Sequence, residues 1–274
     1  MKRTFTLLLL LAALAAPTAL RAQALLDYSL TVSQTTWQSI ASTGTQLTTV
    51  YGDAGIDSVA VPFPMWVGER FFPAGTKLRL RADGYAYFGP ATGATHYSYN
   101  CYNSTSAVYS SMTTLVPYLC TDGSMVQGSS GVYWQVEETD DGDSVFIVEF
   151  QHVNRYNNAS TTDFTYQIRL YANGDISYTY GTMTNNLSTL TETGAFIAAG
   201  ASDRICISGT WAAPIVISPN TINYVSGTPA SGTVFTFSRP TTFCARPVHL
   251  TLADTSTTTA TVAWSVLAAV SGFA

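Results

Sequence analysis

The 274-residue chain carries 12 Lys and Arg against 17 Asp and Glu, which gives a formal net charge of −5, and only 11% of its residues are charged. Because so few basic residues could neutralise a phosphate backbone, this composition argues against nucleic acid as a partner. Threonine and tyrosine take the place of charged residues, and since such residues favour strands, the composition indicates a secreted β-protein.

The first 24 residues predict a signal peptide for export. Lys2 and Arg3 precede the apolar stretch Leu7–Ala16, and Ala22-Gln23-Ala24 is a small-x-small cleavage site. The apolar stretch is short for a bilayer span, with a retained anchor helix as the alternative, and no later apolar run is long enough to span a membrane. We therefore expect a secreted, extracellular or cell-surface protein that has no membrane span once the signal is removed.

Residues 25–240 predict one large β-sandwich module. Tyr28, Leu30 and Val32 alternate with polar residues, which is the period-two pattern of a half-buried strand. Residues 77–82 repeat the pattern, with three basic side chains expected on the solvated face: Lys77, Arg79 and Arg81. No segment of convincing length after residue 24 has helical periodicity, so we expect an all-β, antiparallel, jelly-roll-like sandwich.

Two β-hairpins, at residues 132–150 and 164–180, share one pattern. Each has a three-residue loop that ends in glycine, Asp140-Asp141-Gly142 and Ala172-Asn173-Gly174, which fits a type I turn followed by a glycine bulge. A two-residue turn would set core residues opposite solvent-facing ones, so that register is disfavoured. The loops predict these pairs: Val136 with Phe146, Trp134 with Val148, Val132 with Phe150, Leu170 with Ile176, Ile168 with Tyr178, and Tyr166 with Tyr180.

Four cysteines in an exported protein predict disulfides. Cys101, Cys120, Cys206 and Cys244 allow three connectivities. We favour Cys101–Cys120 and Cys206–Cys244, because short sequential loops close most easily, with four buried thiols as the alternative. No CxxC pair is present, so zinc and redox sites have no support.

Residues 241–274 predict the start of a second domain. Pro247, Leu250 and Leu252 resemble the first strand of a fibronectin type III domain, and Thr261–Trp264 resembles the second strand with its core tryptophan. The resemblance covers about a third of such a domain. It implies a truncated fibronectin type III domain, only the first strands of an incomplete sandwich, and a chain that is a fragment of a longer protein. The alternative is a strand pair docked on the main module.

Several segments of the main module carry a second resemblance. They are Tyr28–Ile40 with its aromatic-x-x-Ile step, Val61–Met65, Leu78–Gly89, Leu115–Tyr118, and the hairpin strands at 146–150 and 164–181. Together they resemble the β-sandwich module found before fibronectin type III repeats in exported bacterial surface proteins, and are distantly similar to the nidogen-type extracellular domain. Cys120 and Asp122 stand where an acidic pattern is expected in that family. The resemblance implies a surface or adhesion role and no catalytic residues.

A tyrosine-rich loop around the expected Cys101–Cys120 bond is the candidate recognition surface. Tyrosine offers a large amphipathic area at low entropic cost, and loops on a rigid sandwich commonly carry binding. The partner would be an extracellular protein or a glycan, and an insertion without a ligand is the alternative. The candidate residues are Tyr97, Tyr99, Tyr102, Asn103, Tyr109 and Tyr118.

An acidic cluster surrounds the first hairpin loop, at Glu138, Asp140, Asp141 and Asp143. Several carboxylates could bind Ca²⁺, but the turn itself explains the Asp-Asp-Gly, so we expect no cofactor, with calcium as the alternative. The same residues approximate the E-x-D-x-x-E pattern of a jelly-roll glycosidase. They straddle a turn, however, so their carboxylates would not point into one cleft.

No other pattern points to catalysis. His96, His152 and His249 form no HxxxH or HExxH motif, and residues 128–131 do not form a G-x-S-x-G elbow. We therefore expect a non-enzymatic adhesion or binding module of a larger modular protein. The alternative is the carbohydrate-binding accessory part of a secreted hydrolase.

Overall fold

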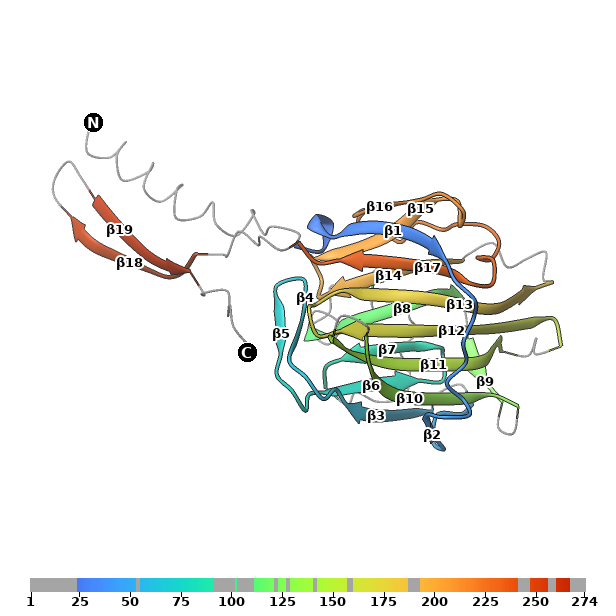
Figure 1. The fold of residues 1–274 in the computed structure, drawn as a ribbon. Helices are drawn as coiled ribbons and strands as arrows, with labels where there is room; N and C mark the ends of the chain where they lie inside the picture. The colour runs from blue at the N-terminus through green and yellow to red at the C-terminus, as the bar shows by residue number, and fades with distance from the viewer. Residues whose placement is uncertain are drawn as a thin grey trace. The chain divides into compact units, whose positions relative to one another are not determined.

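The computed structural model describes residues 24–52, 55–90, 102, 111–120, 123–126, 129–139, 142–156, 160–186, 193–240, 247–255 and 260–266. The chain divides into two compact units, Met1–Arg239 and Pro240–Ala274 (Figure 1). The described elements are strands apart from a short 3₁₀ helix, η2 (Ala24–Asp27). All pairings within the sheets are antiparallel and the sheets do not close into a barrel, so the expected all-β sandwich is confirmed.

The first unit is built from two stacked sheets, which we name sheet A and sheet B (Figure 1). Sheet A has the order β1 (Ser29–Gln34), β17 (Thr233–Ser238), β13 (Ile176–Asn185), β12 (Thr162–Tyr171), β11 (Ser144–Arg155), β10 (Gly131–Glu138) and β2 (Thr45–Leu47), with β9 (Gly123–Met125) also paired to β11. Sheet B has the order β16 (Pro214–Ile217), β15 (Arg204–Gly209), β14 (Thr193–Ala199), β8 (Thr113–Cys120), β7 (Tyr85–Phe88), β6 (Lys77–Arg81) and β3 (Ile56–Ala60). A separate pair consists of β4 (Met65–Val67) and β5 (Arg70–Phe72).

Both hairpins have the register that their loops predict. Val136 pairs with Phe146 and Leu170 with Ile176, and the other four expected pairs also form. Gly142 and Gly174 have φ values of 82° and 93°, the left-handed conformation that glycine adopts without strain. The glycine N–H donates back to Thr139 O in the first loop at 2.8 Å and to Tyr171 O in the second at 2.9 Å. Loop length therefore sets which side chains reach the core.

Three buried tyrosines of sheet A tie it to the backbone of the opposite sheet. The Tyr178 hydroxyl donates to Phe196 O at 2.9 Å in β14, and the Tyr180 hydroxyl donates to Pro117 O at 2.7 Å in β8. The Tyr166 hydroxyl donates to Gly84 O at 2.7 Å, in the turn between β6 and β7. Burial raises the pKa of Tyr178 and Tyr180 well above the usual value, so these phenols stay neutral donors.

The basic side chains of β6 do not all lie on a solvated face, which corrects the sequence-based expectation. Arg81 is only 2% exposed, and its Nε lies 2.9 Å from Asp83 Oδ2. Arg79 is half-buried and donates to Gly89 O, and only Lys77 is exposed. The acid two residues after Arg81 allows its charge to be buried, because a buried charge needs a partner.

The second unit contains two antiparallel strands, β18 (Pro247–Thr255) and β19 (Ala260–Val266), at the positions the sequence predicts. Leu252 pairs with Val262 and Thr251 with Ala263. A two-stranded sheet is common to many folds, so the fibronectin type III identity stays a prediction.

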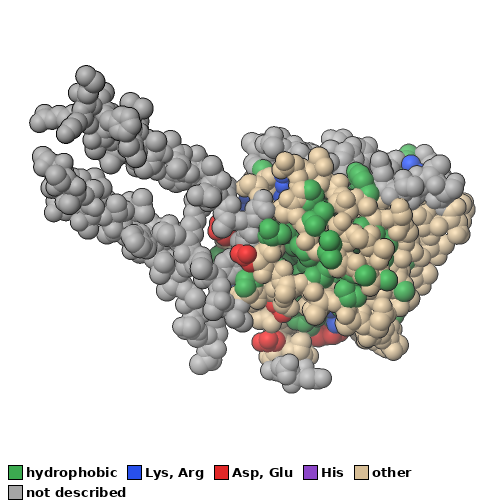
Figure 2. All heavy atoms as spheres, turned by 90° about the horizontal axis from the view of Figure 1, so that it is seen from above, with side chains coloured by type: hydrophobic (Ala, Val, Ile, Leu, Met, Phe, Trp, Pro, Cys, Tyr) green, Lys and Arg blue, Asp and Glu red, His purple; other side chains and the backbone are tan. Residues whose placement is uncertain are grey.

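The surface of the first unit carries few charges. Figure 2 looks onto the side where the edge strands β1 and β16 lie. It shows mainly backbone and side chains that are neither charged nor hydrophobic, with hydrophobic side chains gathered in the middle of this face. The exposed large hydrophobic residues include Val32 of β1 and Ile215 of β16. Among the described residues, the structure contains no helix with the length and apolar character needed to cross a membrane.

Candidate functional site

One segment of chain crosses the whole outer face of sheet A. Strand β1 lies at one edge of this sheet and β2 at the other, so residues 35–44, which we name the crossing segment, must pass over the strands between them (Figure 1). The covered face would otherwise be solvated. The crossing segment therefore converts outward-facing polar side chains of β11, β12 and β13 into a partly enclosed site.

The buried carboxylate of Glu149 holds the centre of the crossing segment. Glu149 Oε2 accepts the Ile40 N–H at 2.8 Å, and Oε1 accepts the Ser39 hydroxyl at 2.7 Å. Gln167, also fully buried, donates from Nε2 to Glu149 Oε2 at 2.8 Å and to Gln38 O at 2.7 Å. Gln151 Nε2 donates to Glu149 Oε1 as well. These bonds satisfy a carboxylate that would be very costly to bury alone.

Two apolar contacts fix the segment on either side of that carboxylate. Ile40 is buried against Val145 and Ile147, with Tyr133 and Tyr171 packed around them. Trp37 lies flat over Gly181 of β13, where a Cβ atom would come within 2.8 Å of Trp37 Cε2. Trp37 and Ile40 are the aromatic-x-x-Ile step of the sequence, so this step anchors the crossing segment.

A polar groove of about 550 Å³ runs between the crossing segment and sheet A. Hydroxyl and amide side chains line most of it, and the charged groups are Arg169 and Glu137. The lining consists of Thr35, Thr36, Gln38, Ser39, Ile40, Thr43, Gln135, Glu137, Arg169, Tyr171, Ser177, Thr179 and Val234. Because every hydroxyl can both donate and accept, such a lining suits a ligand rich in hydroxyl groups.

Arg169 is held in a fixed orientation at this groove. Its Nε and Nη2 donate to Gln167 Oε1 at 3.0 and 2.9 Å, and Gln167 is itself fixed by Glu149 and the Gln38 carbonyl. In the part of the chain that the structure describes, ion pairs join Arg81 with Asp83 and His152 with Asp163, and none includes Arg169. A half-buried, pre-oriented guanidinium without an acidic partner is suited to bind a carboxylate.

The structure places two of the predicted recognition residues in the core. Tyr102 is fully buried, and its hydroxyl donates to Pro219 O at 3.0 Å. Tyr118 is 2% exposed, and its hydroxyl donates to Gly227 O at 3.0 Å. Neither ring is presented to a ligand, which corrects that part of the prediction. Tyr97, Tyr99, Asn103 and Tyr109 lie outside the described residues, where the prediction stands untested.

The acidic cluster for which calcium is the alternative reading is described only in part. Glu138 and Asp143 are exposed at the ends of β10 and of the hairpin loop, and the Asp143 backbone closes the turn with Thr139. Asp140 and Asp141 lie outside the described residues. Among those described, no three His, Cys, Asp or Glu side chains lie close enough together to hold a metal ion. Calcium binding at this loop stays an untested alternative.

Cys206 carries a free, buried thiol. Its sulfur lies 3.8 Å from the Tyr102 hydroxyl oxygen and accepts the Asn223 N–H at 3.5 Å, and burial raises the pKa of the thiol. The thiol packs within sheet B, so Cys206 does not form the favoured Cys206–Cys244 bond in this structure. The side chains of Cys101, Cys120 and Cys244 lie outside the described residues, and the Cys101–Cys120 bond stays a prediction.

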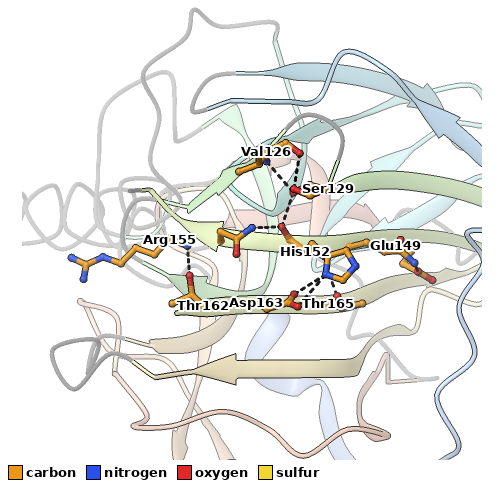
Figure 3. A network of polar contacts seen from close by, with 11 residues as sticks. Val126, Ser129, Glu149, His152, Arg155, Thr162, Asp163 and Thr165 are labelled. Carbon is orange, nitrogen blue, oxygen red and sulfur yellow. Dashed lines mark hydrogen bonds and ion pairs between the residues drawn. The ribbon is translucent and has the colours of Figure 1, made fainter. Parts of the chain in front are cut away.

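A second, smaller hollow of about 320 Å³ lies at His152 and is lined by Ser129, Asn154 and Asp163. Figure 3 shows the polar contacts around His152. His152 occupies a bulge in β11 with φ of 57°, and its Nδ1 lies 3.0 Å from Asp163 Oδ1. Ser129 donates to Val126 O, and the structure forms no hydrogen bond between Ser129 and the His152 ring. The Ser129 hydroxyl is therefore bonded to the backbone of its own loop.

The sequence carries a signal of the bulge, in the spacing of the inward-facing residues of β11. Phe146, Val148 and Phe150 point inward at every second position, but the next inward residue is Val153, three positions on. The broken period turns the His152 side chain outward.

No curated protein and no solved structure matches the chain. A protein-family model described as "NIDO related" matches residues 27–239, which are most of the chain and nearly all of the first unit. The chain therefore belongs to the NIDO-related family.

Proposed function

We propose that this chain is a non-enzymatic adhesion or binding module of a larger extracellular protein, and that its ligand is a glycan bound in the groove beside Arg169. Membership of the NIDO-related family supports an extracellular binding module. The groove volume of about 550 Å³ falls in the usual range of small-ligand sites, about 300–1,000 Å³.

The orientation of Arg169 carries the proposal for the ligand class. Arg169 lines the groove together with the hydroxyl-bearing residues Ser177, Thr179 and Thr43. A ligand that combines several hydroxyls with one carboxylate would satisfy all of these groups. Sugar acids, meaning uronic and sialic acids, have this combination, whereas neutral sugars would leave Arg169 without an anionic partner.

The ligand class can be tested with pairs of sugars, one acidic and one neutral. We would titrate the chain from residue 25 to 274 with a trimer of galacturonic acid and with its methyl ester, and with sialyllactose and lactose, by calorimetry. At least one acid is expected to bind, and its neutral counterpart to bind at least tenfold more weakly, because a charge-assisted hydrogen bond is lost. Absence of binding by all four would overturn the glycan proposal.

Three variants locate the binding at the groove. Arg169→Gln removes the charge and is expected to weaken binding of the acidic sugar by about tenfold or more. Arg169→Lys keeps the charge but loses the planar, two-pronged guanidinium, so its affinity for the acidic sugar should fall less. Glu137→Gln removes an exposed acid that lines the same groove. Since a like charge repels the ligand, this variant is expected to bind the acid more tightly. Unchanged affinities in all three variants would place the ligand elsewhere.

The accessory part of a secreted hydrolase is the second candidate, because the same groove would then hold one segment of a polysaccharide. Binding to insoluble pectin in a pull-down, with release by added galacturonic acid trimer, would favour it over adhesion. Release of reducing sugar from any of these ligands by the purified chain would contradict the non-enzymatic assignment.

A further inference from the structure

The backbone at the start of the sandwich binds a carboxylate from a distant hairpin. The Leu25 N–H, in η2, donates to Asp203 Oδ1 at 2.9 Å, although the two residues are 178 positions apart. Asp203 lies in the loop between β14 and β15. Leu25 is fully buried and Tyr28, three residues later, is 3% exposed, so this stretch is firmly packed against the unit.

The partner of the Asp203 carboxylate, the Leu25 N–H, is neutral, although the surroundings of this carboxylate favour a positive charge. Burial raises the pKa of the Asp203 carboxyl to about 6, and the charges of Glu69 and Asp27 raise it further, while Arg70 and the Leu25 N–H oppose the rise. Among the described residues, no ion pair includes Asp203. A partly buried carboxylate with two acids near it is stabilised far better by a full positive charge than by an amide.

The expected cleavage site supplies such a charge. The sequence motif Ala22-Gln23-Ala24 places the cut between Ala24 and Leu25. We propose that a leader peptidase, with water, hydrolyses this bond, and that the new α-ammonium group of Leu25 forms an ion pair with the Asp203 carboxylate. The Ala24 carbonyl leaves as a carboxylate. The freed amine takes up a proton at neutral pH, because α-amino groups have a pKa of about 8.

Cleavage between Ala24 and Leu25 would therefore stabilise the mature module that begins at Leu25. Before the cut, the nitrogen of Leu25 is an amide and cannot compensate the charge. After the cut, the same nitrogen, already 2.9 Å from the carboxylate, carries the compensating charge without any movement of the chain. A cut at another bond would leave an amide at this position, so the geometry singles out Leu25 as the mature first residue.

A double comparison isolates this ion pair. One chain begins at Leu25, after removal of a fusion partner that leaves no extra residues, and the other begins at Ala22. Each chain is made both with Asp203 and with the substitution Asp203→Asn. Asparagine at this position keeps an acceptor for the Leu25 nitrogen. With Asp203, the chain that begins at Leu25 is expected to melt on the order of 3–6 °C higher at pH 7. In the Asp203→Asn background the difference between the two starts should vanish.

Two further measurements complete the test. Intact-mass and N-terminal analysis of the exported protein should give Leu25 as the first residue, and a different first residue would overturn the proposal. The chain that begins at Ala22 should lose stability as the pH rises from about 4 to 6, because the folded carboxyl, with a pKa of about 6, holds its proton more tightly than the unfolded one at 3.8. Equal melting temperatures for the two starts, with Asp203 present, would equally refute the ion pair.

Discussion

The carboxylate of Glu149 in β11 accepts the backbone N–H of Ile40 at 2.8 Å, across 109 positions of sequence. This bond joins an inner strand of sheet A to the crossing segment. Because the groove lies between those two elements, Glu149 shapes the candidate site without lining it.

Replacement of Glu149 by glutamine should therefore weaken both the fold and the groove. The glutamine retains one oxygen, whereas the carboxylate accepts from Ile40, Ser39, Gln167 and Gln151. We expect a loss of about 2–4 kcal/mol in the free energy of unfolding, measured in urea. Glu137→Gln, at an exposed acid, is the control and should change the free energy by about 0.5 kcal/mol or less. A loss of that same small size for Glu149→Gln would show that the carboxylate does not hold the segment.

Gly181 gives Trp37 room to lie on β13. A Cβ added at this glycine would approach Trp37 Cε2 to 2.8 Å. Gly181→Ala should therefore destabilise the protein by about 1–3 kcal/mol. In a Trp37→Ala background the same substitution should cost much less, and the difference is the coupling energy of the two residues. Additive effects in this double-mutant cycle would mean that the ring does not rest on the glycine.

Alkaline pH should unfold the sandwich cooperatively. Burial raises the pKa of Tyr178 and Tyr180 well above 10, and raises that of Tyr28 to about 12. Below pH 10 these phenols are neutral in both states, but above it the unfolded chain loses protons first, so stability falls as the pH rises. Tyrosinate absorbance at 295 nm should show a second ionisation phase that coincides with loss of the circular dichroism signal. Full ionisation of all tyrosines in the folded protein would contradict this.

Local patterns allowed the strand pairing to be predicted, because loop length and alternation act over a few residues. The partners of Glu149 could not be predicted. Alternation places this acid on the solvated face, and no residue near it in the sequence indicates that the crossing segment covers it. Tyr102 and Tyr118 were misassigned for a related reason. A tyrosine that stacks on a ligand and one that donates to a buried carbonyl look alike until the distant carbonyl, at Pro219 or Gly227, is known.

The backbone of His152, in the bulge of β11, has a strained left-handed conformation. His152 is, among the described residues, the single non-glycine residue with positive φ, at 57°. A side chain in this conformation costs on the order of 1–2 kcal/mol. The cost is opposed by hydrogen bonds to the backbone, from His152 N to Thr165 Oγ1 at 3.2 Å and from Ser130 Oγ to His152 O at 2.7 Å.

Glycine at this position should relieve the strain and keep both backbone bonds. His152→Ala and His152→Gly both lose the contact of the imidazole with Asp163, which is half exposed and contributes little. We therefore expect His152→Gly to be more stable than His152→Ala by about 1 kcal/mol in urea unfolding, the reverse of the usual order for a strand. If alanine proved the more stable of the two, the left-handed conformation at His152 would not hold in solution, and the outward turn of this side chain would need another cause.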